Sequence, residues 1–168
     1  MKLIWTRSSL LSDKHDPITW LFGHRCGHFA IGFFGETIFY HSNWQGGVHV
    51  NEYYEFYSSR IKVYEIDIEL SRSEEVEILQ AMIDLYGDFG YDWKFFAWLT
   101  WAGIKKKLFG IHPPMFIKHQ EPNSIICHEV LNLLPDGVRP DIDLRAAVMP
   151  ETMYRLVQDA MEGYVYEM

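Results

Sequence analysis

Between Arg60 and Leu70, apolar and charged residues alternate, and this two-residue period constrains the fold more strongly than any other feature of the chain. Successive side chains of a β-strand point to opposite faces of a sheet, so the pattern predicts a strand with one face in solvent. The next residues, Ser71 to Glu74, have the sequence of a capping box and predict a helix that ends at Gly87. Its expected core stripe consists of Val76, Leu79, Met82, Ile83 and Tyr86.

Further strands are expected before this segment. Leu3–Arg7 predicts a first strand, and His28–Phe33 with Thr37–His41 predicts a hairpin. Gly46-Gly47 and then Val48–Val50 follow the hairpin. The chain has 168 residues and is 48% hydrophobic, which is enough for one domain with a full core, and no repeat or linker divides it. We therefore predict a single α+β domain over residues 1–168, with an antiparallel sheet packed against helices.

Three more helices are expected in the second half of the chain. The aromatic segment Trp93–Ile111 is interrupted by lysines well short of the ~20 apolar residues that a membrane-spanning helix needs. We expect it to pack on the core, and the alternative is an amphipathic helix that touches a lipid surface. A second helix should begin near Cys127 and run to about Leu134. The last should follow Pro150, with one apolar face formed by Met153, Leu156, Val157 and Ala160.

Charge and cysteine content exclude several functional classes. The formal net charge is -8 and the longest basic run is Lys105–Lys107, so we expect no nucleic-acid partner. Two cysteines do not make a disulfide scaffold, and the stretch from Met1 to Arg7 lacks the continuous apolar run of a signal peptide. We expect a cytoplasmic protein without a transmembrane segment.

Cys127 is the strongest candidate for a reactive residue. It follows Asn123 and Ser124, a polar N-cap signal that leads into an apolar-periodic helix. The start of a helix carries partial positive charge and unsatisfied N–H groups, which favour thiolate over thiol and can hold an oxyanion. Such a thiol would be the nucleophile of a cysteine hydrolase. The alternative is a buried cysteine that serves only packing.

Two histidines have the right positions to assist such a thiol. His28 begins one strand of the expected hairpin and His41 ends the next, so antiparallel pairing should bring the two side chains together. A cysteine hydrolase needs an imidazole that shuttles the proton and a third group that fixes its tautomer. We therefore assign the candidate catalytic residues as Cys127, His28 and His41.

The order of these residues resembles the circularly permuted branch of the NlpC-type papain-like cysteine hydrolases, which includes lecithin retinol acyltransferase and compact bacterial and phage proteins. In this family the histidine precedes the cysteine in the sequence. The matching segments are Leu3–Ser8, His28–Gly32, Phe39–Ser42 with Gly46–Val48, Tyr91–Trp93, Cys127–Val130 and the helix after Pro150. The resemblance covers nearly the whole chain and implies a permuted papain-like fold, with an antiparallel sheet or half-barrel against helices.

Carried over to this chain, the resemblance implies Cys127 as nucleophile, His28 as general base and acid, and His41 as the residue that orients His28. The backbone N–H of Cys127 would contribute to the oxyanion hole, and no cofactor or metal is implied. The preferred substrate is an amide in a cell-wall peptide, and the alternative is a thioester or ester acyl group, hydrolysed or transferred. In a phage, such a protein would be a virion part or would act on a host partner.

Two departures from the family and two other classes of function stay open. Cys26 precedes His28 by two residues and is a second candidate thiol, and His128 adds an imidazole beside Cys127. His24, Cys26 and His28 alternate, so together with Cys127 or His128 they could form a zinc site. The fold could also have lost its chemistry and act as a structural or host-interaction protein.

Overall fold

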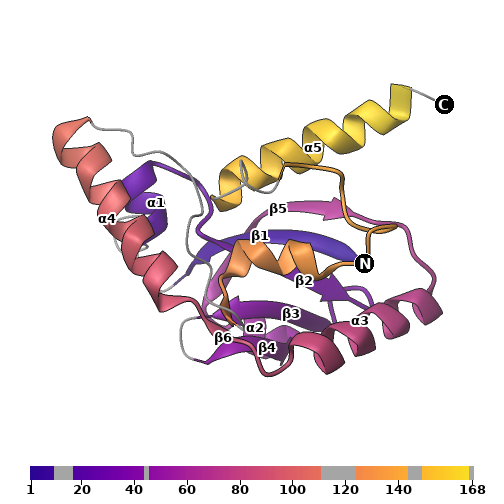
Figure 1. Ribbon diagram of the computed structural model, residues 1–168. Helices are drawn as coiled ribbons and strands as arrows, with labels where there is room; N and C mark the ends of the chain where they lie inside the picture. Colours follow the sequence, from indigo (N-terminus) through magenta and orange to yellow (C-terminus); the bar gives the residue numbers. More distant parts are fainter. Residues whose placement is uncertain (10–16, 44–45, 111–123, 144–148, 167–168) are drawn as a thin grey trace.

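The computed structural model describes residues 1–9, 17–43, 46–110, 124–143 and 149–166, and a five-stranded antiparallel sheet lies at its centre (Figure 1). The sheet order is β4-β3-β2-β1-β5. The strands are β1 (Lys2–Ser8), β2 (His28–Phe33), β3 (Ile38–Asn43), β4 (Gly47–Glu52) and β5 (Arg60–Asp67). A second, two-stranded parallel sheet pairs β6 (Gly90–Tyr91) with β7 (Ser124–Ile125).

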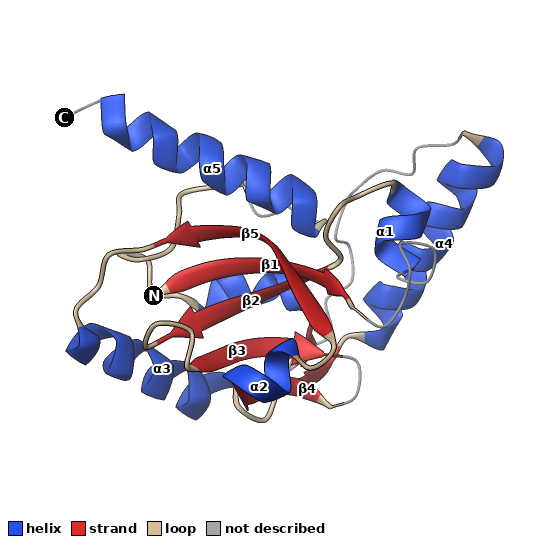
Figure 2. Ribbon diagram, turned by 180° about the vertical axis from the view of Figure 1, so that it is seen from behind, coloured by secondary structure: helices blue, strands red, loops and turns tan. Residues whose placement is uncertain are grey.

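Helices lie on both faces of the large sheet. The α-helices are α1 (Pro17–Phe22), α2 (Tyr53–Tyr57), α3 (Arg72–Tyr86), α4 (Trp93–Phe109) and α5 (Pro150–Tyr166), and a 3-10 helix, η1, covers Cys127–Leu133. Helix η1 lies over the face that is turned to the viewer in Figure 1, and α2 lies over the opposite face, which Figure 2 shows. The predicted α+β class with an antiparallel sheet is confirmed.

The pleat of the strands separates two hydrophobic clusters. The main core lies on the η1 side, where Phe29 and Ile31 of β2 meet Val130 and Leu131 of η1. The smaller cluster lies on the α2 side and consists of Ile4, Ala30, Phe39 and Phe56. Phe39 and Phe56 stack with ring centroids 4.2 Å apart, and this contact fixes α2 against the sheet. Residues of even number in β2, including His28, therefore share the face that α2 covers.

The expected strands are all present, with ends that differ by a few residues. The hairpin of β2 and β3 has the predicted partners, and β5 stops at Asp67, three residues before the end of the alternating pattern. The capping box is confirmed, because the Ser71 hydroxyl accepts a hydrogen bond from the Glu74 N–H and the Glu74 carboxylate accepts one from the Ser71 N–H.

The predicted core stripe of α3 is partly wrong. Leu79 and Met82 are buried as expected, but Val76 is 51% exposed and Ile83 is 38% exposed. The helix is turned so that Glu75 faces inward, where its carboxylate pairs with the Met1 ammonium at 2.7 Å and accepts a hydrogen bond from the Phe34 N–H.

The predicted helix at Cys127 is an irregular 3-10 helix and not an α-helix. It begins directly after β7 and is followed by Pro135, which leaves room for about two turns, and 3-10 geometry is common in such short pieces. Its N-cap is Ile126, so no side-chain oxygen caps it from that position. Ser124 belongs to β7, and Asn123 lies outside the described residues.

Helices α1 and α4 form an arm that projects from one side of the sheet (Figures 1 and 2). Gly103 allows α4 to pack closely on α1, because a Cβ at this position would lie 2.9 Å from Leu21 Cβ and 2.8 Å from the Phe22 ring. Helix α4 packs mainly on this neighbour and on a small cluster with Ile126 and Met149, separate from the main core. Within the described part of the chain, no helix combines the length and the hydrophobicity that crossing a membrane requires.

Candidate functional site

His28 and His41 are in contact, as the hairpin predicts. His28 begins β2, His41 lies in β3, and the Nε2 atom of His28 is 3.2 Å from the Nδ1 atom of His41. The two rings meet edge to face, with centroids 5.0 Å apart. One nitrogen must donate and the other must accept, so at least one of these imidazoles is neutral.

Asn51 of β4 extends this pair into a chain of three side chains. Its Oδ1 atom lies 2.5 Å from His41 Nε2 and can only accept, so His41 carries its proton on Nε2. The Nδ1 atom of His41 is then the acceptor, and His28 donates to it from Nε2. This arrangement leaves Nδ1 of neutral His28 with the lone pair that a general base needs.

Burial keeps both histidines neutral. His41 is fully buried and contacts the Phe56 ring, and desolvation lowers its pKa to about 3, with a smaller contribution from the Arg60 guanidinium. Desolvation is also the main reason why the pKa of His28 lies well below its usual value. The electrostatic interactions with Arg60 and His41 lower this pKa further. Two uncharged imidazoles at neutral pH suit a proton relay.

Two polar atoms beside the pair are buried without a hydrogen-bond partner among the described residues. They are Oγ1 of Thr6, which lies opposite His28 across the β1–β2 ladder, and Nε2 of His49, which lies opposite His41 across the β3–β4 ladder. Buried polar atoms are rarely left unsatisfied, and exceptions are common where a ligand or water binds. These atoms therefore mark the surroundings of the histidine pair as a candidate binding site.

Arg60, the first residue of β5, adds a positive charge to the site. It packs over the Phe56 ring, with its guanidinium carbon 5.0 Å from the ring centroid. Burial lowers its pKa, while the negative charge of a Cys127 thiolate raises it. By reciprocity, the guanidinium favours the thiolate form of Cys127. Arg60 is thus within electrostatic range of both histidines and of the cysteine.

Cys127 is the first residue of η1 and is 8% exposed. The segment before it is tied to β3, because the Ser42 hydroxyl donates a hydrogen bond of 2.9 Å to the Ile125 carbonyl. At the helix start, the Glu129 carboxylate accepts a hydrogen bond of 2.9 Å from the Ile126 N–H. Ser42 is the neighbour of His41 in β3 and points to the other face of the sheet, so β3 contacts the segment that carries the thiol on one face and contributes His41 to the relay on the other.

The turn before α4 also approaches Cys127. Asp92 caps α4, since its Oδ1 atom accepts a hydrogen bond of 2.8 Å from the Phe95 N–H, and β6 pairs Tyr91 with Ile125. Desolvation raises the pKa of the Tyr91 hydroxyl, and the charge of a Cys127 thiolate raises it further. Tyr91 is therefore a neutral hydrogen-bond donor near the thiol.

The β4–β6 junction holds this turn in place. Gly47 has a φ of +86°, and an added Cβ would lie 2.1 Å from the Phe89 carbonyl oxygen. The same carbonyl accepts a hydrogen bond of 3.0 Å from the Val48 N–H. Only glycine permits such an approach of two backbones.

Cys26 does not share a face with His28, in contrast to the sequence expectation. It precedes β2, is fully buried and belongs to the main core cluster, whereas His28 contacts Phe56 on the opposite face. Among the described residues, no three histidine, cysteine or acidic side chains are grouped in a way that could hold a metal ion. The proposed zinc ligands His24, Cys26 and His28 thus do not converge, and the side chain of His128 lies outside the described residues.

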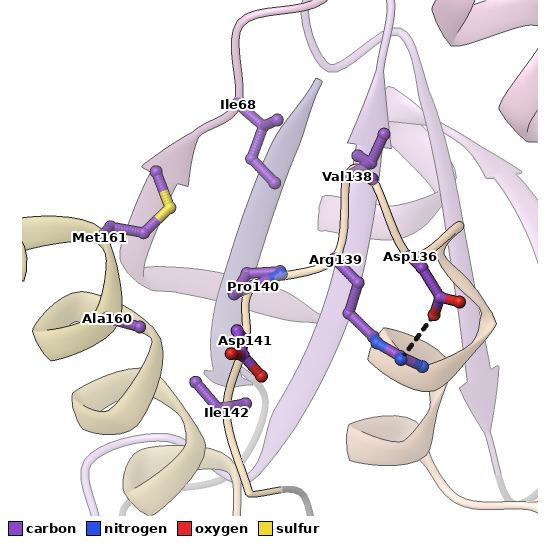
Figure 3. A pocket seen from close by; sticks show the side chains of 10 residues that line it. Ile68, Asp136, Val138, Arg139, Pro140, Asp141, Ile142, Ala160 and Met161 are labelled. Atoms are coloured by element: carbon purple, nitrogen blue, oxygen red, sulfur yellow. Dashed lines mark hydrogen bonds and ion pairs between the residues drawn. The ribbon is translucent and has the colours of Figure 1, made fainter. Parts of the chain in front are cut away.

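A cavity of about 680 Å³ lies elsewhere, between α5, the end of β5 and the loop from Asp136 to Ile142 (Figure 3). Arg139 and Asp136 form an ion pair of 2.7 Å at its edge. Neither histidine nor cysteine lines this cavity, so it contains no part of the candidate catalytic set.

Asn51 and Arg60 were not found from the sequence. Asn51 lies beyond the predicted hairpin, and only the pairing of β3 with β4 brings it to His41. Arg60 begins the alternating strand, and nothing in its neighbours distinguishes it from a solvent-exposed charge. Their roles depend on strand pairing, which a single sequence specifies poorly.

The depressed pKa of His41 has a consequence for stability. An unfolded histidine takes up a proton near pH ~6.5, whereas folded His41 stays neutral down to about 3. Stability is therefore fully present above ~6.5 and falls as the pH drops through this window, by up to about 1.4 kcal/mol per pH unit for one group. Urea unfolding at a series of pH values should show this slope. In His41→Gln the slope should be smaller, because one proton fewer is taken up on unfolding. An unchanged slope in the variant would contradict the assignment.

The α+β domain thus carries a partly buried chain of two histidines and an asparagine, with Arg60 within electrostatic range of both histidines and of Cys127. The chain matches no protein-family model, no curated protein and no solved structure. The relation to the permuted papain-like hydrolases accordingly stays a prediction based on the order of the motifs.

Proposed function

We propose that this protein is a cysteine hydrolase of the permuted papain-like type, with Cys127 as the nucleophile. The observation that supports the proposal best is the chain from His28 through His41 to Asn51. It fixes the tautomer in which Nδ1 of His28 can accept a proton, and this is the task of the base in such enzymes. Under this proposal, the sheet is the half-barrel of the papain-like fold and η1 is its nucleophile helix.

The reaction follows from these roles. The histidine pair contacts Phe56 on the α2 face and η1 lies on the other face (Figure 1), so the reaction requires the segment with Cys127 to bring its thiol to Nδ1 of His28. The thiol then gives its proton to Nδ1 of His28, and the sulfur forms a bond to the substrate carbonyl carbon. Protonated His28 then returns the proton to the leaving amine, the carbon–nitrogen bond breaks, and a thioester remains on Cys127. Water attacks this thioester while His28 accepts its proton, and the carboxylic acid and the thiol are released. His41 and Asn51 hold the ring of His28 throughout.

Arg60 assists the first step in this mechanism. A resting pair of thiolate and imidazolium needs a histidine that is readily protonated, and burial opposes this at His28. A fixed guanidinium within range of Cys127 stabilises the developing thiolate instead. The site can therefore begin its cycle with a neutral histidine.

We propose an amide in a cell-wall peptide as the substrate, with a host cytoplasm or a virion as the place of action. The compact single domain supports this choice, as in the bacterial and phage proteins whose motif order it resembles. Acyl thioesters and esters react by the same steps, with another leaving group, and belong in the same substrate screen.

The proposal is tested by the pH dependence of iodoacetamide modification, with the labelled cysteine located by mass spectrometry. Cys127 should react rapidly well below the ~8.5 of a free thiol. Arg60→Gln should slow labelling at neutral pH, and Arg60→Lys, which keeps the positive charge, should restore most of the rate. If Cys127 in the folded protein resists the reagent at every pH at which it stays folded, the cysteine serves packing and the hydrolase proposal fails.

A further inference from the structure

Helix α4 carries an exposed apolar stripe along its length. Trp101 is 55% exposed, Leu108 is 69% exposed and Phe109 is 68% exposed. Along the helix, the exposed residues of the stripe are Trp93, Ala97, Trp101 and Leu108. They are four or seven positions apart, and this spacing places them on one side of an α-helix.

The opposite side of α4 is apolar as well and packs against the rest of the protein. Phe95, Leu99, Ala102 and Gly103 are buried, and the last of these packs directly on α1. A helix that is apolar on all sides is normally buried on all sides in a water-soluble protein. Here one side packs on the protein and the other is exposed, so a further partner is expected on the exposed side.

The charges around the stripe indicate the chemistry of that partner. Helix α4 contains four lysines and no acidic residue, although the chain has a formal net charge of -8. The Lys105 ammonium lies 5.3 Å from the Trp101 ring centroid, and the Lys107 ammonium lies 3.6 Å from that of Trp20, which is itself 47% exposed. Positive charge beside exposed aromatic and aliphatic side chains is complementary to an anionic surface with an apolar interior.

A second copy of the chain fits this surface less well. Two copies that met through α4 would bring eight lysines together without acidic residues of the same helix to oppose them. The position of the arm also favours a flat partner, because α1 and α4 project from one side of the sheet (Figures 1 and 2). A helix of 17 residues is about 25 Å long and can lie flat along such a surface.

We propose that the arm of α1 and α4 docks on an anionic lipid bilayer. Helix α4 lies parallel to the membrane plane, with Trp101 and Leu108 among the acyl chains and its lysines beside the lipid phosphates. The helix does not cross the bilayer. This docking is independent of the proposed hydrolase chemistry, so Cys127→Ala should bind the same vesicles with unchanged affinity.

The test is co-sedimentation of the whole protein with vesicles of phosphatidylcholine and phosphatidylglycerol in equal parts, beside vesicles of phosphatidylcholine alone. We expect binding to the anionic vesicles, weakening as salt is added, and little binding to the neutral ones. Brominated acyl chains should quench the tryptophan fluorescence of the wild-type protein, which needs no variant and reports insertion directly.

Two variants distinguish binding through the stripe of α4 from nonspecific hydrophobic binding. The double variant Trp101→Ser with Leu108→Ser should lower the partition coefficient by about tenfold or more. The matched control is Leu85→Ser, which makes the same change at a leucine of α3 that is 64% exposed, and it should bind like the wild type.

Three results of the vesicle experiments would overturn the proposal. These are the absence of binding and quenching with anionic vesicles, an equal loss of binding in Leu85→Ser, and equal binding to neutral vesicles. A concentration-dependent dimer that the double variant abolishes would also overturn it and would assign the stripe to a second copy of the chain. Circular dichroism of the variants establishes that they are folded, and the quenching result stands without them.

Discussion

Replacing His28 by glutamine is expected to lower kcat/KM by about a thousandfold once a substrate has been found. Glutamine keeps a hydrogen-bonding side chain at the start of β2 but cannot accept the thiol proton, and general acid–base catalysis contributes about 10² to 10⁴ in rate. The measurement is the steady-state rate of the variant on the best peptide or ester from the screen, together with its iodoacetamide labelling.

The control for this experiment is His24→Gln. His24 is also partly buried and also has a lowered pKa because of desolvation, but it contacts Phe22 of the arm and not the histidine relay. It should retain nearly full activity. If both variants lose activity equally, the loss reflects damage to the fold. Unchanged activity in His28→Gln would exclude His28 as the base.

Replacing Cys127 by alanine is expected to abolish turnover, by about 10⁴-fold or more, because no other group in the site can form the thioester. The folded state should survive, since a buried cysteine of this size leaves only a small cavity. The readouts are turnover and the urea midpoint, measured on the same preparation.

Cys26→Ala provides the matched comparison, because Cys26 is also buried but belongs to the main core. It should lose some stability and keep its turnover. The reverse result, with activity lost in Cys26→Ala and retained in Cys127→Ala, would identify Cys26 as the nucleophile and exclude Cys127.

Local patterns predicted most of the elements. Alternation predicted β5, and the Ser71 capping box predicted the start of α3, because both signals act within a few residues of the chain. The buried face of α3 was not predictable in the same way. Glu75 faces inward because its partner is the Met1 ammonium, and no local pattern connects residues 74 positions apart.

The candidate site shows the same division. The contact between His28 and His41 follows from a hairpin, and a hairpin is a local structure. Asn51 and Arg60 reach the site through the register of β4 and through the pairing of β5 with β1. These long-range pairings depend on the whole sheet, so the sequence offered no sign of either residue.

The two halves of the candidate site differ in how firmly the fold holds them. The relay lies in three successive strands of the large sheet, which should open only when the domain unfolds as a whole. The segment with Cys127 is held by a two-residue strand pair and a 3-10 helix, whose hydrogen bonds are weaker. Local opening of β7 and η1 would thus move the thiol while the relay stays intact. Resistance to oxidation and access for substrate would then both be governed by the same small fluctuation.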